Sequence, residues 1–285
     1  MLKEKFLQEY QETMRNIIVA EAQGFCWGVR RALDIVDQYG PVSILGDLIH
    51  NKQVVQELEQ KEKRVIHDVT GEEKTPIVIT AHGTTAEKLA NLDDLGMDVV
   101  DTTCPLVSAI YRAGKKLEAE GYHIVIIGDK KHIEVKGIAS RMHEPILIND
   151  EKEISQVNFP DKVGVICQST FSQNKLERLI ELMRPEVKEL KVKNTICSPT
   201  KNRQLAAEEL AQTVEIMIVI GGYHSSNTKK LVELSLQYVE SYHIETAAEL
   251  NSDWFAGKAE VGIIAGASTP DWIIEGVSQR IAAFE

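Results

Sequence analysis

Short apolar runs recur along this chain, and each one ends in a polar loop. The runs cover residues 42–45, 77–80, 124–127, 163–166, 216–220 and 261–265. Between them lie stretches with apolar residues at helical spacing, as in 107–119, 173–183, 204–212 and 228–238. Buried strands that alternate with amphipathic helices are typical of parallel sheets with helices on their faces. The pattern therefore predicts an α/β protein with mostly parallel sheets.

The pattern repeats three times, and each third contains one cysteine in a turn-like segment ahead of a helix. These cysteines are Cys26, Cys104 and Cys197. We expect three similar α/β domains, preceded by a helical extension at residues 1–15; their limits are 16–103, 104–196 and 197–285. Ligands of such sheets bind beyond the carboxyl ends of the strands. Inward-pointing strand ends would gather the cysteines and the polar loops pseudo-symmetrically around one central cavity.

The three cysteines come from separate segments without a Cys-x-x-Cys pair, unlike the paired ligands of zinc fingers and ribbons. They suit a [4Fe–4S] cluster that is held at three irons and leaves the fourth iron open. Any one of them, taken alone, reads more simply as a small buried hydrophobic residue. A structural zinc site, with Cys167 or a histidine as fourth ligand, is an alternative. Cys167 ends an apolar run outside the cysteine repeat, so we expect it in the core.

The polar loops at the predicted strand ends carry donors for an anion, namely His50, His82, Ser225, Asn227 and Ser268. Backbone N–H groups at helix starts favour phosphate, and hydroxyl and imidazole groups add further donors. Helix capping by the Ser-Ser-Asn segment and hydrogen-bonded loop histidines are the simpler alternatives. The joint placement of these residues favours a phosphate or diphosphate ligand.

Glu134 is the one carboxylate of note in these six loops, two residues after His132. A carboxylic acid beside an imidazole is suited to proton donation with a relay behind it. A first-turn acid that simply stabilises the helix dipole is the alternative.

Composition narrows the classes of function. The chain has 285 residues, 43% of them hydrophobic, and a formal net charge of −11. This charge disfavours a nucleic-acid partner, which binds through Lys and Arg. No apolar run is long enough to cross a bilayer, and the charged N-terminus lacks the apolar stretch of a secretory signal. We therefore expect a cytoplasmic protein without a membrane partner, in which spaced cysteines bind metal more often than they form disulfides.

From about Ile17 to Ile281 the chain resembles the 4-hydroxy-3-methylbut-2-enyl diphosphate reductase family, an enzyme family of isoprenoid biosynthesis. The segments around the three cysteines (24–29, 101–105 and 194–197) are similar to its cluster motifs. The histidine motifs at 50–52 and 81–83, the Arg-Gln step at 203–204, and the segments 224–227 and 266–271 complete the likeness.

The resemblance implies three α/β domains around a central [4Fe–4S] cluster on Cys26, Cys104 and Cys197, whose open iron binds the substrate hydroxyl. Two electrons and two protons would remove that oxygen as water and give isopentenyl or dimethylallyl diphosphate. Glu134 would deliver protons with support from His132, and Ser169 and Thr170 would lie near the reacting end of the substrate. The remaining residues would hold the diphosphate, namely His50, His82, Ser225, Ser226, Asn227 and Ser268.

The electrons would come from a separate ferredoxin or flavodoxin, because the chain shows no Gly-rich dinucleotide fingerprint. Three positions depart from the family pattern. Ile133 stands where Pro is common, which leaves the aim of Glu134 less restricted. Ser169 replaces a threonine but keeps the hydroxyl, and Pro199 falls near a helix start.

Other functions are open to the sequence. One is a diverged paralogue that acts on another small diphosphate, and a second is a non-catalytic iron–sulfur protein. Quinolinate synthase also combines three α/β units with three cysteines, but the histidine and Ser-Ser-Asn motifs of this chain do not resemble it.

Overall fold

The computed structural model describes residues 15–284. The predicted helical extension at 1–15 thus lies outside the described residues except for Arg15. The chain divides into two compact units: a middle unit of residues 27–198, and a terminal unit of residues 15–26 and 199–284. Each unit is described by itself below.

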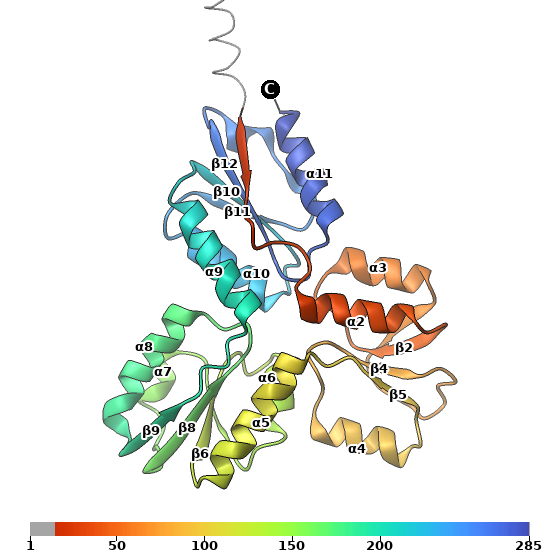
Figure 1. The fold of residues 1–285 in the computed structure, drawn as a ribbon, viewed down its shortest axis with the longest axis vertical. Helices are drawn as coiled ribbons and strands as arrows, with labels where there is room; N and C mark the ends of the chain where they lie inside the picture. The colour runs from red at the N-terminus through yellow and green to blue at the C-terminus, as the bar shows by residue number, and fades with distance from the viewer. Residues whose placement is uncertain (1–14, 285) are drawn as a thin grey trace, which may run out of the picture. The chain divides into compact units, whose positions relative to one another are not determined.

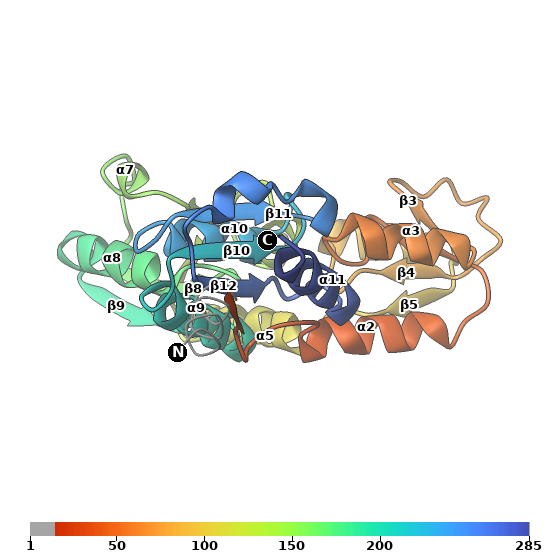
Figure 2. The ribbon, with the colours of Figure 1, turned by 90° about the horizontal axis from the view of Figure 1, so that it is seen from above.

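The middle unit contains two parallel four-stranded sheets (Figure 1). The first has the strand order β3-β2-β4-β5, with β2 (Val42–Leu45), β3 (Lys63–Ile66), β4 (Ile77–Ile79) and β5 (Val99–Asp101). Strands β4 and β5 are paired and run side by side (Figure 2). Helices α2 (Trp27–Asp37) and α3 (Lys52–Gln60) cover one face, and α4 (Ala86–Asp94) covers the other.

The second sheet of the middle unit repeats this arrangement with the order β7-β6-β8-β9. Its strands are β6 (His123–Ile127), β7 (Ile146–Ile148), β8 (Lys162–Cys167) and β9 (Glu189–Val192). Its helices are α5 (Pro105–Ala119), α6 (Ile133–Ala139), α7 (Glu151–Ile154) and α8 (Gln173–Met183), followed by the short turn η1 (Arg184–Glu186). The buried run from Val163 to Cys167 packs on both faces, as expected of a central parallel strand.

The terminal unit contains the third parallel sheet, in the order β1-β12-β10-β11. Its strands are β1 (Asn16–Val19), β10 (Ile216–Ile220), β11 (Ser241–Ile244) and β12 (Glu260–Ala265). Its helices are α9 (Ser198–Ala211), α10 (Ser226–Ser235) and α11 (Asp271–Ala282), with the turns η2 (Ala247–Glu249) and η3 (Ser252–Phe255). Three sheets of one topology confirm the predicted α/β class with three similar domains.

The first strand of the chain corrects one predicted domain limit. We expected residues 16–103 to form the first domain, but β1 pairs in parallel with β12, with Asn16 opposite Glu260. Next to β12, β1 takes the edge position that β5 and β9 take next to β4 and β8. A strand can pair with any free sheet edge, even one that is distant in the chain, and residues 16–19 complete the last sheet. The limits near 103 and 196 stay predictions.

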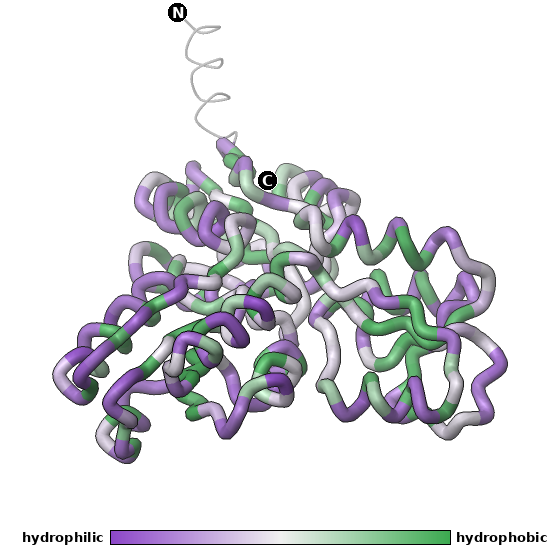
Figure 3. The backbone as a smooth tube through the Cα atoms, turned by 60° about the horizontal axis from the view of Figure 1, so that its bottom comes forward, coloured by the Kyte–Doolittle hydropathy of each residue, from purple (hydrophilic) through white to green (hydrophobic). Residues whose placement is uncertain are grey.

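Hydrophobic and hydrophilic residues alternate along the chain (Figure 3), and the strands carry most of the buried hydrophobic residues. In the second sheet, Ile124, Ile126 and Ile166 pack under α5 and α6 on one face. Val163, Val165 and Cys167 pack on the opposite face, with residues of α8. Among the described residues, no helix is long and apolar enough to span a membrane.

Candidate active site

The three predicted cysteines hold matching places in the three domains. Each directly precedes a helix that follows the edge strand of its sheet, namely α2, α5 or α9. Each cysteine N–H donates to the carbonyl of the residue two positions beyond the end of a neighbouring strand. These 3.0 Å bonds join Cys26 to Ala267, Cys104 to Ala81 and Cys197 to Ser169. The repeat therefore extends from sequence pattern to individual hydrogen bonds.

These positions suit an iron–sulfur cluster. All three cysteines are free and half-buried. The thiolate is the form of cysteine that binds iron. Cys167 differs: it is fully buried in the core, as expected, and burial raises the pKa of its thiol. Its Sγ accepts hydrogen bonds from the N–H and the hydroxyl of Thr195.

Two arginines hold the loops that lead into the cysteines. Arg203, buried in α9, donates to the carbonyl of Gly24 at 2.6 Å. Arg31 of α2 donates to the carbonyls of Thr102 and Thr103 at 3.3 and 3.4 Å. Arg203 belongs to the Arg-Gln step at 203–204, for which the sequence suggested no role. Arg31 gave no sequence signal, because its acceptors are backbone atoms 71 and 72 residues away.

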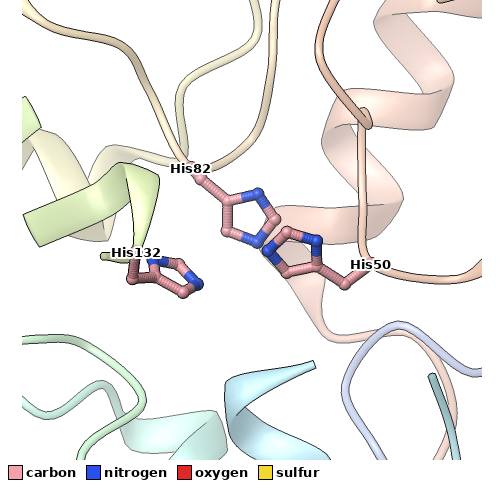
Figure 4. A group of neighbouring side chains, drawn as sticks. All are labelled: His50, His82 and His132. Atoms are coloured by element: carbon pink, nitrogen blue, oxygen red, sulfur yellow. The ribbon is translucent and has the colours of Figure 1, made fainter. Parts of the chain in front are cut away.

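Three histidines of the middle unit meet at the ends of their strands (Figure 4). His50 follows β2, His82 follows β4, and His132 is the N-cap of α6. The rings of His50 and His82 stack with centroids 4.3 Å apart, and His132 meets both edge-on at 5.4 and 5.5 Å. One ring nitrogen from each lies within 4.8 Å of the others.

Burial disfavours the charged form of two rings in this cluster, His82 and His132. Burial, followed by the neighbouring His50 and His132, holds the pKa of His82 well below its usual value. Burial also lowers the pKa of His132 to about 4. The Nδ1 atom of His132 accepts the N–H of Glu134 at 3.1 Å, so Nε2 carries the proton of the neutral ring.

This arrangement fits an anion better than a metal ion. In stacked rings the nitrogen lone pairs lie in parallel planes and do not converge on one point. His132 has a proton rather than a lone pair on Nε2, because Nδ1 already accepts a bond. Ring N–H groups, in contrast, are suitable donors to phosphate oxygens.

Glu134 forms a buried pair with Ser169. Its Oε1 accepts the backbone N–H of Ser169 at 2.6 Å, and its Oε2 lies 2.7 Å from the Ser169 hydroxyl. Burial raises the pKa of Glu134, while the two bonds from Ser169 oppose that shift. The Ser169 carbonyl in turn accepts the N–H of Cys197. A buried carboxyl group with a raised pKa is thus linked through one residue to a predicted cluster ligand.

The departures from the family pattern do not displace this acid. Ile133 is the first residue of α6, where Pro is most favoured, and the helix forms there without Pro. Ser169 supplies the hydroxyl that bonds to Glu134, and Thr170 follows it in the turn after β8. Pro199 is the second residue of α9 and fits the first turn of that helix.

The terminal unit holds the other predicted anion-binding residues. Ser225 is the N-cap of α10 and accepts the N–H of Thr228 at 3.3 Å. Ser226 is the first residue of the helix, and Ser268 is buried just after β12. Asn227 is buried, and among the described residues neither its Oδ1 nor its Nδ2 has a hydrogen-bond partner. An amide in that state fits a ligand that supplies the missing bonds.

The structure thus places the predicted residues in two sets. The middle unit contains Cys104, Cys197, His50, His82, His132, Glu134, Ser169 and Thr170. The terminal unit contains Cys26, Ser225, Ser226, Asn227 and Ser268. The sequence missed Gln53, the second residue of α3, which corresponds in position to Glu134 in α6 and Asn227 in α10. Its Oε1 is also buried without a partner among the described residues.

Known proteins are similar to this chain over most of its length. Residues 17–282 match a family model described as LytB protein. A 4-hydroxy-3-methylbut-2-enyl diphosphate reductase of Geobacter sulfurreducens is 39% identical over 276 residues, which are 95% of this chain and 98% of the relative. One of Campylobacter concisus is 41% identical over 93% of this chain and 98% of the relative.

Two solved structures are similar. One is described as (E)-4-hydroxy-3-methyl-but-2-enyl diphosphate reductase, the terminal enzyme of the non-mevalonate pathway. It is 39% identical with a TM-score of 0.68, over 94% of this chain and 99% of that chain. The other, an E-1-hydroxy-2-methyl-but-2-enyl-4-diphosphate reductase from Plasmodium falciparum, is 24% identical with a TM-score of 0.89, over 93% and 87%, and shows the fold alone. The chain belongs to the LytB family.

Proposed function

We propose that this protein reduces 4-hydroxy-3-methylbut-2-enyl diphosphate to isopentenyl diphosphate and dimethylallyl diphosphate. The substrate takes up two electrons and two protons, its C–O bond breaks, and the oxygen leaves as water. The observation that carries this proposal is the buried Glu134–Ser169 pair, bonded to the backbone of Cys197 in the same unit as the histidine cluster. The names of the family relatives support the substrate.

Cys26, Cys104 and Cys197 would hold one [4Fe–4S] cluster per chain, since their matching half-buried positions suit three thiolate ligands. With three protein ligands, the cluster supplies electrons and an open iron for the substrate hydroxyl. Replacement of Cys104 by Ser should therefore remove the iron. Replacement of the core residue Cys167 by Ala should retain it, and equal iron content in the two variants would contradict this ligand set.

Glu134 would provide protons at its carboxyl oxygens. Burial favours its protonated form, and a buried acid that keeps its proton near neutral pH can act as a general acid. The Ser169 hydroxyl fixes one oxygen and the Ser169 N–H fixes the other. His132, whose Nδ1 accepts the Glu134 N–H, would support proton delivery from the start of the same helix.

The diphosphate would be held by neutral donors. Imidazole N–H groups of His50, His82 and His132 supply one part of the site. The others are supplied by Ser225, Ser226, Asn227 and Ser268 of the terminal unit. The buried Asn227 amide would gain its missing hydrogen bonds when the ligand is present.

The electrons would come from a separate ferredoxin or flavodoxin, since the sequence lacks a dinucleotide motif of its own. Such carriers are soluble proteins, and we place the reaction in the cytoplasm with them.

The first test is anaerobic turnover of 4-hydroxy-3-methylbut-2-enyl diphosphate by iron-loaded protein, with a chemically reduced viologen as donor. We expect dye oxidation in step with formation of both five-carbon diphosphates. A fully loaded protein that does not turn over this substrate would refute the proposed function and point to a paralogue with another substrate. The viologen separates this question from the identity of the natural electron carrier.

A further inference from the structure

One side chain that has no role in the proposed site lies where three segments of that site meet. Tyr111 belongs to α5, the helix that begins just after Cys104. Its hydroxyl lies against Gly83, which directly follows His82 in the chain. It also lies against Gly137 of α6, one turn after Glu134. The phenol therefore separates the histidine loop from the helix that carries the acid.

The two glycines show how close this contact is. A Cβ atom at Gly83 would lie 2.4 Å from the Tyr111 hydroxyl, and the φ of Gly83 is +76°, which favours glycine. A Cβ atom at Gly137 would lie 3.1 Å from the same hydroxyl and 3.0 Å from the carbonyl oxygen of Thr84. Only residues without a side chain allow the loop, the phenol and the helix to approach this closely.

Arg141 fastens the same contact from the end of α6. Its guanidinium donates to the carbonyls of Thr84 at 2.8 Å and Gly137 at 2.7 Å. It also stacks 4.2 Å above the ring of Tyr111. Its neighbour Ser140 accepts the N–H of Ala86 at 2.9 Å. The segment that follows His82 is thus bonded to the helix that follows Glu134.

The Tyr111 hydroxyl itself forms no hydrogen bond with any residue the structure describes, although it is buried. A buried hydroxyl without a partner is unfavourable and calls for an explanation. Burial raises the pKa of Tyr111 to about 12, so the group stays neutral. Its contacts with Gly83 and Gly137 explain it as a spacer of fixed size between two functional segments.

We propose that Tyr111 and Arg141 are positioning residues that set the separation between the imidazole of His82 and the carboxyl group of Glu134. This inference rests on the proposed function for its catalytic consequence. If His82 binds diphosphate and Glu134 delivers a proton to the other end of the substrate, their separation must match the substrate length. Two glycines, one phenol and one guanidinium hold that separation.

The test adds one methyl group at the contact with Gly137→Ala in the iron-loaded protein. The methyl pushes on the phenol and on the Thr84 carbonyl without altering any proposed binding or catalytic residue. We expect about tenfold weaker binding of inorganic diphosphate by calorimetry and about a tenfold lower kcat, because small misplacements are costly in a preorganised site. The matched control is Gly276→Ala in α11, where a Cβ meets nothing within 4 Å; it should change neither quantity.

A double variant distinguishes positioning from general damage. Tyr111→Phe removes one of the two atoms that the new methyl meets, and the contact with the Thr84 carbonyl remains. Gly137→Ala with Tyr111→Phe should therefore regain part of the lost affinity and rate. If the two residues had only independent structural roles, the losses in the single variants Gly137→Ala and Tyr111→Phe would add in the double variant. Arg141→Met, which removes the bond to Thr84, should weaken diphosphate binding with unchanged iron content, and Arg141→Lys should lie between Met and the wild type.

Additive losses in the double variant, or Gly137→Ala behaviour equal to the Gly276→Ala control, would overturn the inference. If Gly137→Ala does not fold, Arg141→Met decides alone, and unchanged diphosphate affinity there would also overturn it. Failure of the proposed function is a separate result: the wild type would then lack turnover, while the diphosphate-binding pattern of the variants would still report on positioning.

Discussion

The first turns of α6 and α10 occupy the same place in two domains of one fold, yet they present different chemistry. Each helix follows an inner strand, β6 or β10, next to the strand that ends at the cysteine-bonded loop. Its second residue is Glu134 in α6 and Asn227 in α10. Both side chains are buried, but the acid is fully bonded and the amide is not.

The difference follows from the residue at the end of the adjacent strand. Two positions after β8 stands Ser169, which bonds both oxygens of Glu134. Two positions after β12 stands Ala267, which has no side-chain donor. A hydroxyl at this position bonds to the acid. Where it is absent, the amide has no hydrogen-bond partner among the described residues.

The largest expected effect comes from making α6 resemble α10. Glu134→Gln keeps the shape and burial of the side chain but removes the exchangeable proton. We expect turnover to fall by at least about 100-fold, because general acid catalysis contributes that much or more. The cluster absorbance and the iron content should stay as in the wild type. A variant that reduces substrate at the wild-type rate would mean that the proton comes from another group.

The reciprocal change makes α10 resemble α6. Asn227→Asp places a buried carboxylate at the proposed anion site, and like charges at close range repel strongly where water is excluded. We expect binding of inorganic diphosphate to weaken on the order of 100-fold. The control is Asn251→Asp at the exposed N-cap of η3, which adds the same charge elsewhere in the terminal unit. Equal effects of the two changes would show that net charge, not the site, is responsible.

A smaller effect tests the strand-end hydroxyl. Ser169→Ala removes the hydroxyl bond to Glu134 but keeps the backbone bond, so the loss should be about tenfold in kcat. The Ser169 bonds lower the pKa of Glu134 against the effect of burial. Without the hydroxyl that pKa rises, and the alkaline limb of the pH–rate profile should move to higher pH. Ser169→Thr, which restores a hydroxyl, should return both values toward the wild type.

The smallest effect concerns protons taken up on binding. Burial lowers the pKa of His82 and His132, so both rings are neutral at pH 6 in the absence of ligand. A bound diphosphate favours the charged form and raises these pKa values, so binding at pH 6 should take up a fraction of a proton. Calorimetry in buffers of different ionisation enthalpy measures that number.

Two variants test whether the histidine cluster is the group that takes up the proton. His132→Asn keeps an N-cap for α6 but cannot titrate, so it should lower the number of protons. Asn227→Ala should weaken binding and leave the number unchanged, because the amide does not titrate. Proton uptake that is insensitive to His132→Asn would place the titrating group elsewhere.

Much of the site could be predicted from the sequence because its residues stand at strand ends. Turn position and residue type are local properties, so Cys104, His82 and Glu134 could be identified without knowledge of their neighbours. The assignment of Cys167 to the core came from the same reasoning, and the structure confirms it. The cluster ligands and the diphosphate contacts stay predictions.

Contacts between distant segments could not be predicted. The assignment of residues 16–19 to the first domain was wrong, because nothing in the local sequence of an edge strand indicates the strand with which it pairs. Arg31, Tyr111 and Arg141 act on backbone atoms or on glycines far away in the chain, and such acceptors leave no pattern in residue types.

The sequence by itself determined the class of fold, the threefold repeat and the set of polar residues at the strand ends. Periodicity and residue type are local properties of a sequence. Only the tertiary structure decided the protonation of that set. Burial lowers the pKa of His82 and His132 and raises that of Glu134, and burial depends on what packs around a group rather than on its neighbours in the chain. The choice of Ser169 as the partner of Glu134, 35 residues away, likewise required the parallel pairing of β6 with β8.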